Sequence, residues 1–190
     1  MLHKLLLKIA RESIEEHLGT QHTIDHSTLL THYPELKKEM ATFVTLTLHG
    51  ELRGCIGSII PHRTLLQDVI HNASSAAFKD PRFNPLSRNE YLQSSIEISL
   101  LTPPQELIYQ DTSDLKSKIR PKIDGVIIQK GGYSATFLPQ VWEQLPTFEL
   151  FFAHLGQKAG LGSDMLALHP KIEIYQVEHF EDKPINGSGK

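Results

Sequence analysis

Apolar and polar residues alternate over 42–48, and this alternation constrains the fold more than any other feature of the sequence. A period of two predicts a strand with one buried face. His49 and Gly50 then predict a tight turn, after which residues 52–60 return as a second strand. The chain is therefore expected to contain an antiparallel hairpin over 42–60.

The same order of elements recurs in the second half of the chain. Each half is predicted to contain a hairpin, then a helix, then a further strand, over 42–60, 64–79 and 94–101 and again over 125–138, 148–159 and 171–178. The predicted class is α+β, with a mainly antiparallel curved sheet built from two β-β-α-β-like repeats and helices outside. A doubly wound parallel fold is less favoured, because hairpins outnumber strand–helix–strand crossovers.

Composition excludes several classes of protein. Of 190 residues, 39% are hydrophobic and 22% are charged, which is typical of a soluble globular protein and not of a membrane or disordered one. A net charge of -3 provides no overall basic field for nucleic acid. The single cysteine excludes an internal disulfide and suits a reducing compartment. Lys8 interrupts the apolar N-terminal run, so we expect no export signal and a cytoplasmic location.

Three segments are expected along the chain. They are an N-terminal helix with a connector over 1–40, a domain of two pseudo-repeated lobes over 40–182, and a flexible tail over 183–190. The connector contains His22, His26 and His32. His22 and His26 would share one helix face and could bind a divalent metal, but no cysteine or acidic residue is placed to complete a site. No metal or cofactor is assigned, and whether these histidines bind metal stays open.

The second strand of the first hairpin contains the candidate site. Cys55 has a glycine on either side within two residues, Gly54 and Gly57, and Arg53 lies two positions upstream. Residues two apart on a strand point to the same face, so the guanidinium and the thiol can share a surface. Glycines inside a strand often mark a close approach to the backbone. Cys55 is the candidate nucleophile; the alternatives are a role in lining a binding cleft and simple packing.

Three further residues are candidates for ligand binding. Asp80 and Arg82 lie in a loop stiffened by two prolines, where they either pair as a structural brace or line the same cleft as Arg53. Lys158 lies near a helix C-terminus, where the helix dipole alone favours a cation, so a structural role is the alternative.

The sequence resembles the AMMECR domain family, also known as protein A of the AmmeMemoRadiSam system. The resemblance covers about residues 40–180. It rests on Leu52-Arg53-Gly54-Cys55-Ile56-Gly57, Asp80-Pro81-Arg82-Phe83, Ile98 to Pro103, Gly125-Val126, Phe137 to Val141 and Lys158-Ala159-Gly160-Leu161, in that order. The resemblance implies no settled biochemical activity. It implies association with a Memo-like protein, similar to metal-dependent dioxygenases, and with a radical S-adenosylmethionine protein.

The expected function is that of a ligand- or partner-binding module acting beside these two proteins through an Arg53/Cys55 cleft. One alternative is a thiol-dependent enzyme using Cys55 on a small anionic substrate, which would need a base such as His62, His71 or His154. A second alternative is nucleic-acid binding, favoured only by a local basic run of Lys116, Lys118, Arg120 and Lys122.

Overall fold

The structure is a computed structural model, and it describes residues 1–19 and 24–185. It divides into two compact units. Unit 1 contains Met1–Leu101 with the chain from Glu178 onward, and unit 2 contains Thr102–Val177. No helix in the described part of the chain is long and apolar enough to cross a membrane.

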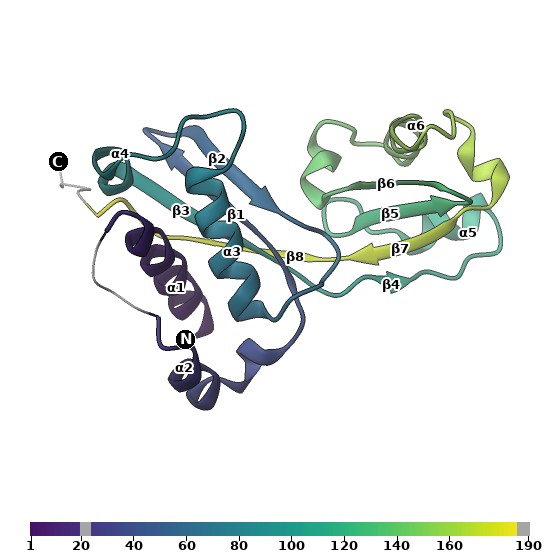
Figure 1. Cartoon of the computed structure of the whole chain (residues 1–190). Coiled ribbons are helices and arrows are strands. Elements are labelled where there is room, and N and C mark those ends of the chain that lie inside the picture. The colour runs from purple at the N-terminus through teal and green to yellow at the C-terminus, as the bar shows by residue number, and fades with distance from the viewer. Residues whose placement is uncertain (20–23, 186–190) are drawn as a thin grey trace. The chain divides into compact units, whose positions relative to one another are not determined.

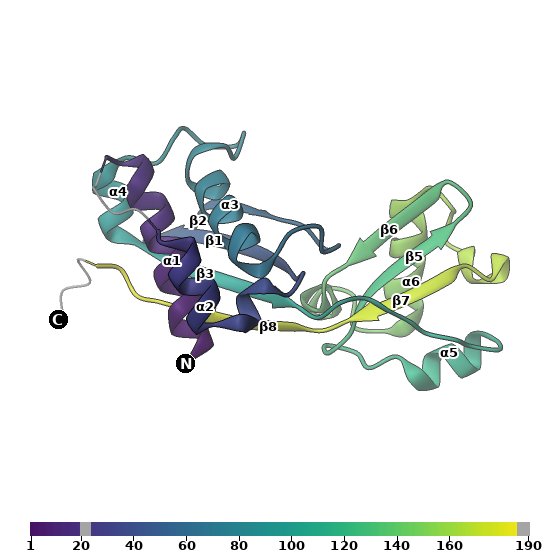
Figure 2. The same ribbon diagram turned by 60° about the horizontal axis from the view of Figure 1, so that its bottom comes forward.

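Unit 1 is an antiparallel sheet with helices on one face (Figures 1 and 2). The sheet has the order β2-β1-β3-β8. Its elements are α1 (Leu2–His17), α2 (His26–His32), a 3-10 turn η1 (Pro34–Lys37), β1 (Ala41–Leu48), β2 (Glu51–Gly57), α3 (Leu65–Phe78), α4 (Arg88–Gln93), β3 (Ser94–Leu101) and β8 (Val177–Glu181).

Unit 2 repeats this plan around a second sheet, of order β4-β7-β5-β6. Its elements are β4 (Gln105–Glu106), α5 (Thr112–Lys118), β5 (Gly125–Lys130), β6 (Tyr133–Phe137), η2 (Pro139–Glu143), α6 (Phe148–Ala159), η3 (Met165–Leu168) and β7 (Lys171–Tyr175). In both sheets the second hairpin strand lies at an edge, the first lies beside it, and the returning strand is third. The predicted α+β class, antiparallel pairing and β-β-α-β-like repeats are confirmed.

The strands of the described residues form two four-stranded sheets and not one continuous sheet, which corrects the sequence-based expectation. Each sheet buries its own apolar face, and the buried residues form two separate clusters. The strand expected over 171–178 is correspondingly divided at Gln176, so that β7 belongs to the second sheet and β8 to the first. Thr102 and Gln176 exchange hydrogen bonds at this point, which satisfies the backbone where the chain leaves one sheet.

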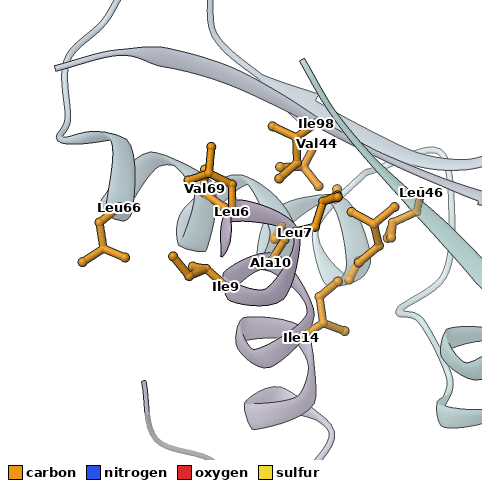
Figure 3. Packing of buried hydrophobic residues seen from close by; sticks show 14 of the residues in the cluster. Leu6, Leu7, Ile9, Ala10, Ile14, Val44, Leu46, Leu66, Val69 and Ile98 are labelled. Atoms are coloured by element: carbon orange, nitrogen blue, oxygen red, sulfur yellow. The ribbon is translucent and has the colours of Figure 1, made fainter. Parts of the chain in front are cut away.

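The core of unit 1 lies between the sheet and the helices α1 and α3. Figure 3 shows Leu6, Ile9 and Ala10 of α1 facing Val69 of α3 and Val44 of β1. All five are at most 1% exposed. Each fully buried aliphatic side chain contributes about 1.5–3 kcal/mol of transfer free energy, so this packing fixes which face of the sheet the helices cover.

The turn between β1 and β2 explains how the hairpin starts. His49 and Gly50 both have positive φ, 54° and 84°. Positive φ at both central residues is the geometry of a type I′ turn, whose twist matches that of the two strands. Glycine adopts this conformation without a steric penalty. The turn therefore sets the pairing of Leu48 with Glu51.

Candidate functional site

Within the paired stretch of the hairpin, β2 has one extra residue that has no partner on β1, and that residue is Arg53. Leu46 lies opposite Gly54 and Thr47 lies opposite Leu52, so Arg53 has no partner on β1. A bulge of this kind bends the strand and redirects the side chain of the extra residue. The Arg53 side chain is turned into the loop after α3 and is only 8% exposed as a residue.

Arg53 anchors this loop to the sheet. Its Nε donates to Glu90 Oε1 at 2.9 Å, and its Nη2 donates to the Asn84 carbonyl, also at 2.9 Å. The guanidinium lies 5.6 Å from the centre of the Phe83 ring. Glu90 also accepts the Ser87 backbone N–H, completing the cap of α4. The hydrogen bond from Arg53 is the main reason that the pKa of Glu90 falls to about 2.

Asp80 joins the same loop to β2 at Cys55. The Asp80 carboxylate is 4% exposed and accepts the backbone N–H of Cys55 at 2.9 Å. It also accepts two hydrogen bonds from the Arg82 guanidinium, from Nε at 2.9 Å and from Nη2 at 2.7 Å. Arg82 Nη2 reaches the Cys55 carbonyl at 3.4 Å. The side-chain hydrogen bonds from Arg82 hold the pKa of Asp80 well below its usual range.

The Cys55 side chain lies on the sheet face that points away from the helices. Its neighbour across the strands is Thr45, whose hydroxyl donates to the Cys55 sulfur at 3.2 Å. Glu97 lies opposite Thr45 on the other side, so the three side chains form a row over β2, β1 and β3. The cysteine is half-buried. The thiol is thus held in place and still accessible.

No histidine in the described part of the chain hydrogen-bonds to this sulfur. His179, on β8, forms a hydrogen bond with Ser99, with 2.9 Å between Nδ1 and Oγ. However, β8 lies three strands from β2. Three strand spacings amount to about 14 Å, too far for proton transfer. His71 lies on α3, on the helical side of the sheet. His62 contacts the Ile60 carbonyl instead. Among the described residues of unit 1, the arrangement therefore positions the thiol with no histidine hydrogen-bonded to it.

The two glycines beside the thiol are explained by packing within unit 1. A Cβ on Gly54 would lie 2.1 Å from the Ala76 carbonyl oxygen, so β2 touches the backbone of α3 there. A Cβ on Gly57 would lie 2.3 Å from the Thr42 carbonyl oxygen and 2.5 Å from the Phe43 ring. Contacts this short do not occur for real side chains, so both positions need glycine whether or not anything binds nearby.

Known proteins are similar in sequence to the segments that contain the bulged Arg53, the Asp80–Arg82 pair and Cys55. The AMMECR1 family model matches residues 7–180. The chain belongs to the AMMECR1 family.

Relatives in archaea cover nearly the whole chain. A protein of Methanothermobacter thermautotrophicus is 36% identical over 92% of this chain and 90% of its own length. A protein of Pyrococcus furiosus is 37% identical over 98% of this chain and 91% of its own length. The crystal structure of an uncharacterized protein from Pyrococcus horikoshii matches with a TM-score of 0.76 and 36% identity, over 98% of this chain and 94% of that one. These AMMECR1 relatives confirm the family and the fold, and their names state no activity.

Lys158, the remaining candidate in the AMMECR1 motif segments, belongs to unit 2, whereas the other candidates belong to unit 1. It lies in the last turn of α6, and its ammonium donates to the Thr136 carbonyl of β6 at 2.9 Å. The same ammonium lies 5.0 Å from the centre of the Phe137 ring. Lys158 thus connects α6 to the edge strand β6.

The basic run of unit 2 is largely neutralised by carboxylates. Lys116 pairs with Glu149, Lys118 with Asp114, and Arg120 with Asp124. Most aromatic residues of the same unit pack into its core, where Trp142 stacks on Phe151 at 3.7 Å, and Tyr133 on β6 is exposed. Base stacking requires exposed rings beside free cations, so this surface does not favour nucleic acid.

The connector histidines divide between described and undescribed residues. His22 lies outside the described residues, as does the predicted tail from 186 onward. His26 begins α2, whose N-cap is Asp25, and His32 ends it. Within residues 1–19 and 24–185, no group of three or more potential metal ligands is close enough to hold an ion.

Two neighbours of the motif were missed by the sequence analysis. Glu90 was visible as a helix cap, but its pairing with Arg53 depends on the loop between them. Thr45 was visible as a strand residue facing away from the core. A regular hairpin with the same turn would place Thr45 opposite Gly54, and the bulge at Arg53 shifts its partner to Cys55.

Proposed function

We propose that this AMMECR1-family chain is a ligand- or partner-binding module, and that its contact surface is the sheet face around Cys55, Thr45 and Arg82. The supporting observation is the Asp80 bridge from the proline loop to the Cys55 backbone. It fixes a half-buried thiol beside a guanidinium that is 53% exposed. Fixed side chains lose little conformational entropy when a partner binds, so such a surface favours recognition.

The positioning of the thiol favours binding over catalysis. A catalytic thiol needs a base or a cation that activates the sulfur directly. Here the Cys55 sulfur has the Thr45 hydroxyl as its hydrogen-bond partner, and Arg82 is directed to the Asp80 carboxylate and the Cys55 carbonyl. Arg53 is engaged by Glu90 and is nine-tenths buried, so we assign it a positioning role in this surface.

The proposed partners are a Memo-like protein and a radical S-adenosylmethionine protein, within the cytosol. This part of the proposal rests on the family resemblance. The alternative is a thiol-dependent enzyme in which Cys55 attacks a small anionic substrate, and the experiment below separates the two.

Cys55 is the only cysteine of the chain, so N-ethylmaleimide modifies this one position. The experiment measures binding of each purified candidate partner to untreated protein, treated protein and treated Cys55→Ser protein. The proposal expects binding to fall at least about tenfold on treatment and to persist in treated Cys55→Ser, because only the bulky adduct blocks the surface. Unchanged binding after complete modification would overturn it. If Cys55→Ser protein binds its partners normally but the assembled system then shows no turnover, the enzyme alternative would be established.

Arg82 provides a second test of the same surface. We expect Arg82→Gln to weaken partner binding several-fold, because it removes an exposed cation next to the thiol. Arg88→Gln is the matched control, since Arg88 is also exposed but lies on α4. Equal effects of the two substitutions would indicate non-specific electrostatic attraction to the partner and would contradict a defined contact surface.

A further inference from the structure

A cavity of about 270 Å³ opens on the helical side of unit 1, where α1, α2 and α3 meet. Its polar lining consists of three histidines, a lysine, a glutamine and two serines, His17, His26, His71, Lys79, Gln67, Ser74 and Ser75. None of these lining residues is acidic. The sheet face that contains Cys55 points the other way, so this cavity is a separate feature.

The His17 ring is fixed by three contacts. Its Nδ1 lies 3.0 Å from the Ser13 carbonyl, and its Nε2 lies 3.1 Å from Ser74 Oγ. It also stacks on Phe78 at 5.2 Å. A carbonyl oxygen only accepts, so Nδ1 must hold a hydrogen, and Nε2 faces the cavity serine.

This geometry couples the charge of His17 to the Ser74 hydroxyl. In neutral His17, Nε2 accepts the Ser74 hydroxyl hydrogen. In the imidazolium, Nε2 donates to Ser74 Oγ, and the serine hydrogen becomes free to donate to something else. Ser74 lines the cavity, so an acceptor group bound there can take this hydrogen bond.

The charges around the cavity are predominantly positive. His71 is surrounded by Arg63, Lys79 and His62, and burial together with Arg63 and Lys79 lowers its pKa. The nearby carboxylates are engaged elsewhere. Asp68 pairs with Arg63 and accepts from Thr42, while Glu16 accepts the Ile24 backbone N–H. Asp25, beside His26, accepts from Ser27 and Thr28 as the N-cap of α2. An anion in the cavity would relieve the repulsion between its cations.

We propose that this cavity binds the phosphate group of a small phosphorylated molecule. Lys79 supplies positive charge, His71 supplies a ring N–H donor, and Ser74 supplies a hydroxyl donor when His17 is charged. A phosphate group is doubly charged near neutral pH and has several acceptor oxygens, which matches a lining of donors. A volume of about 270 Å³ suits a small molecule.

The test follows the histidine ring signals by NMR while inorganic phosphate, and then glycerol 3-phosphate, is added at constant ionic strength. At about pH 7.5, where the phosphate group is mostly doubly charged, we expect saturable shifts of the His17 and His71 ring signals. His154, an exposed histidine of unit 2, is the internal control and should not shift. Shifts of His154 equal to those of His17 would overturn the proposal, as would no saturation.

Substitutions localise the binding. We expect Lys79→Gln and Ser74→Ala each to weaken phosphate binding at least about fivefold, because each removes a donor from the cavity. Lys4→Gln, at an exposed position of α1 outside this cavity, should leave it unchanged. Lys79 is exposed, so its loss should not unfold the protein, and circular dichroism checks this. Indistinguishable affinities of Lys79→Gln and wild type would exclude the site.

Discussion

The backbone N–H of Cys55 donates to the buried Asp80 carboxylate at 2.9 Å. β2 is an edge strand of its sheet, and this hydrogen bond occupies a backbone donor that points away from β1. Arg82 approaches the carbonyl of the same residue. The loop therefore closes the sheet edge beside the thiol, where an unpaired edge would otherwise invite another strand.

Loss of the Asp80 carboxylate should destabilise the protein. Asp80→Ala leaves the Cys55 N–H unpaired and releases Arg82, so we expect a cost of about 2–3 kcal/mol in the free energy of unfolding. Urea denaturation followed by circular dichroism measures it. Glu51→Ala is the control at an exposed position of the same strand, with an expected effect within about 0.5 kcal/mol. Equal midpoints for the two variants would contradict a structural role of the bridge.

The Arg53–Glu90 pair should make stability depend on acid pH. Folding lowers the pKa of Glu90 from an ordinary value of 4.5 to about 2. A lowered pKa means that the contribution is complete above about pH 4.5 and disappears as pH falls toward 2. Glu90→Gln should therefore be less stable than wild type at pH 7, and the difference should shrink below about pH 4. Urea midpoints at several pH values measure this, and a pH-independent difference would be incompatible with it.

Local patterns predicted the elements well because each depends on neighbours in sequence. The alternation over 42–48 and the turn at His49 are visible in the chain, as is the cap formed by Ser87 and Glu90. The division into two sheets was not predictable in this way. It depends on which apolar face is buried against which helix, and that is decided by packing between distant segments.

Part of the candidate site was predictable because it depends on residues that are close together in sequence, and the rest depends on distant residues. Asp80 and Arg82 are two residues apart, and the structural brace is the arrangement found. The partner of Arg53 is Glu90, 37 positions away, and the bulge that turns Arg53 toward it has no signature in an isolated strand. A one-residue change of register moves a side chain to a different partner, and alternation alone cannot show where it occurs.

Gly54 tests the close contact between β2 and α3. A Cβ there would lie 2.1 Å from the Ala76 carbonyl oxygen, which is helix backbone and cannot rotate away. We expect Gly54→Ala to cost about 1–3 kcal/mol or more in the free energy of unfolding through overpacking. Gly132→Ala is the matched control, because nothing lies within 4 Å of its Cβ position. Thermal unfolding compares the two, and a wild-type melting temperature for Gly54→Ala would refute the contact.

The reactivity of Cys55 distinguishes a positioned thiol from an activated one. Cys55 is half-buried, and its sulfur accepts a hydrogen bond from the Thr45 hydroxyl. Half-burial limits access to the sulfur, so we expect iodoacetamide to alkylate folded protein more slowly than free glutathione near pH 7.5, and unfolded protein at about the glutathione rate.

Thr45→Val is the matched variant, because it removes the hydroxyl and nearly keeps the side-chain volume. We expect it to change the alkylation rate by no more than about threefold, since the hydroxyl positions the thiol and does not take its proton. Mass spectrometry gives these rates for the single cysteine. Alkylation more than about tenfold faster than glutathione, persisting to about pH 6, would require a cation or base acting on the sulfur and would favour the enzyme alternative.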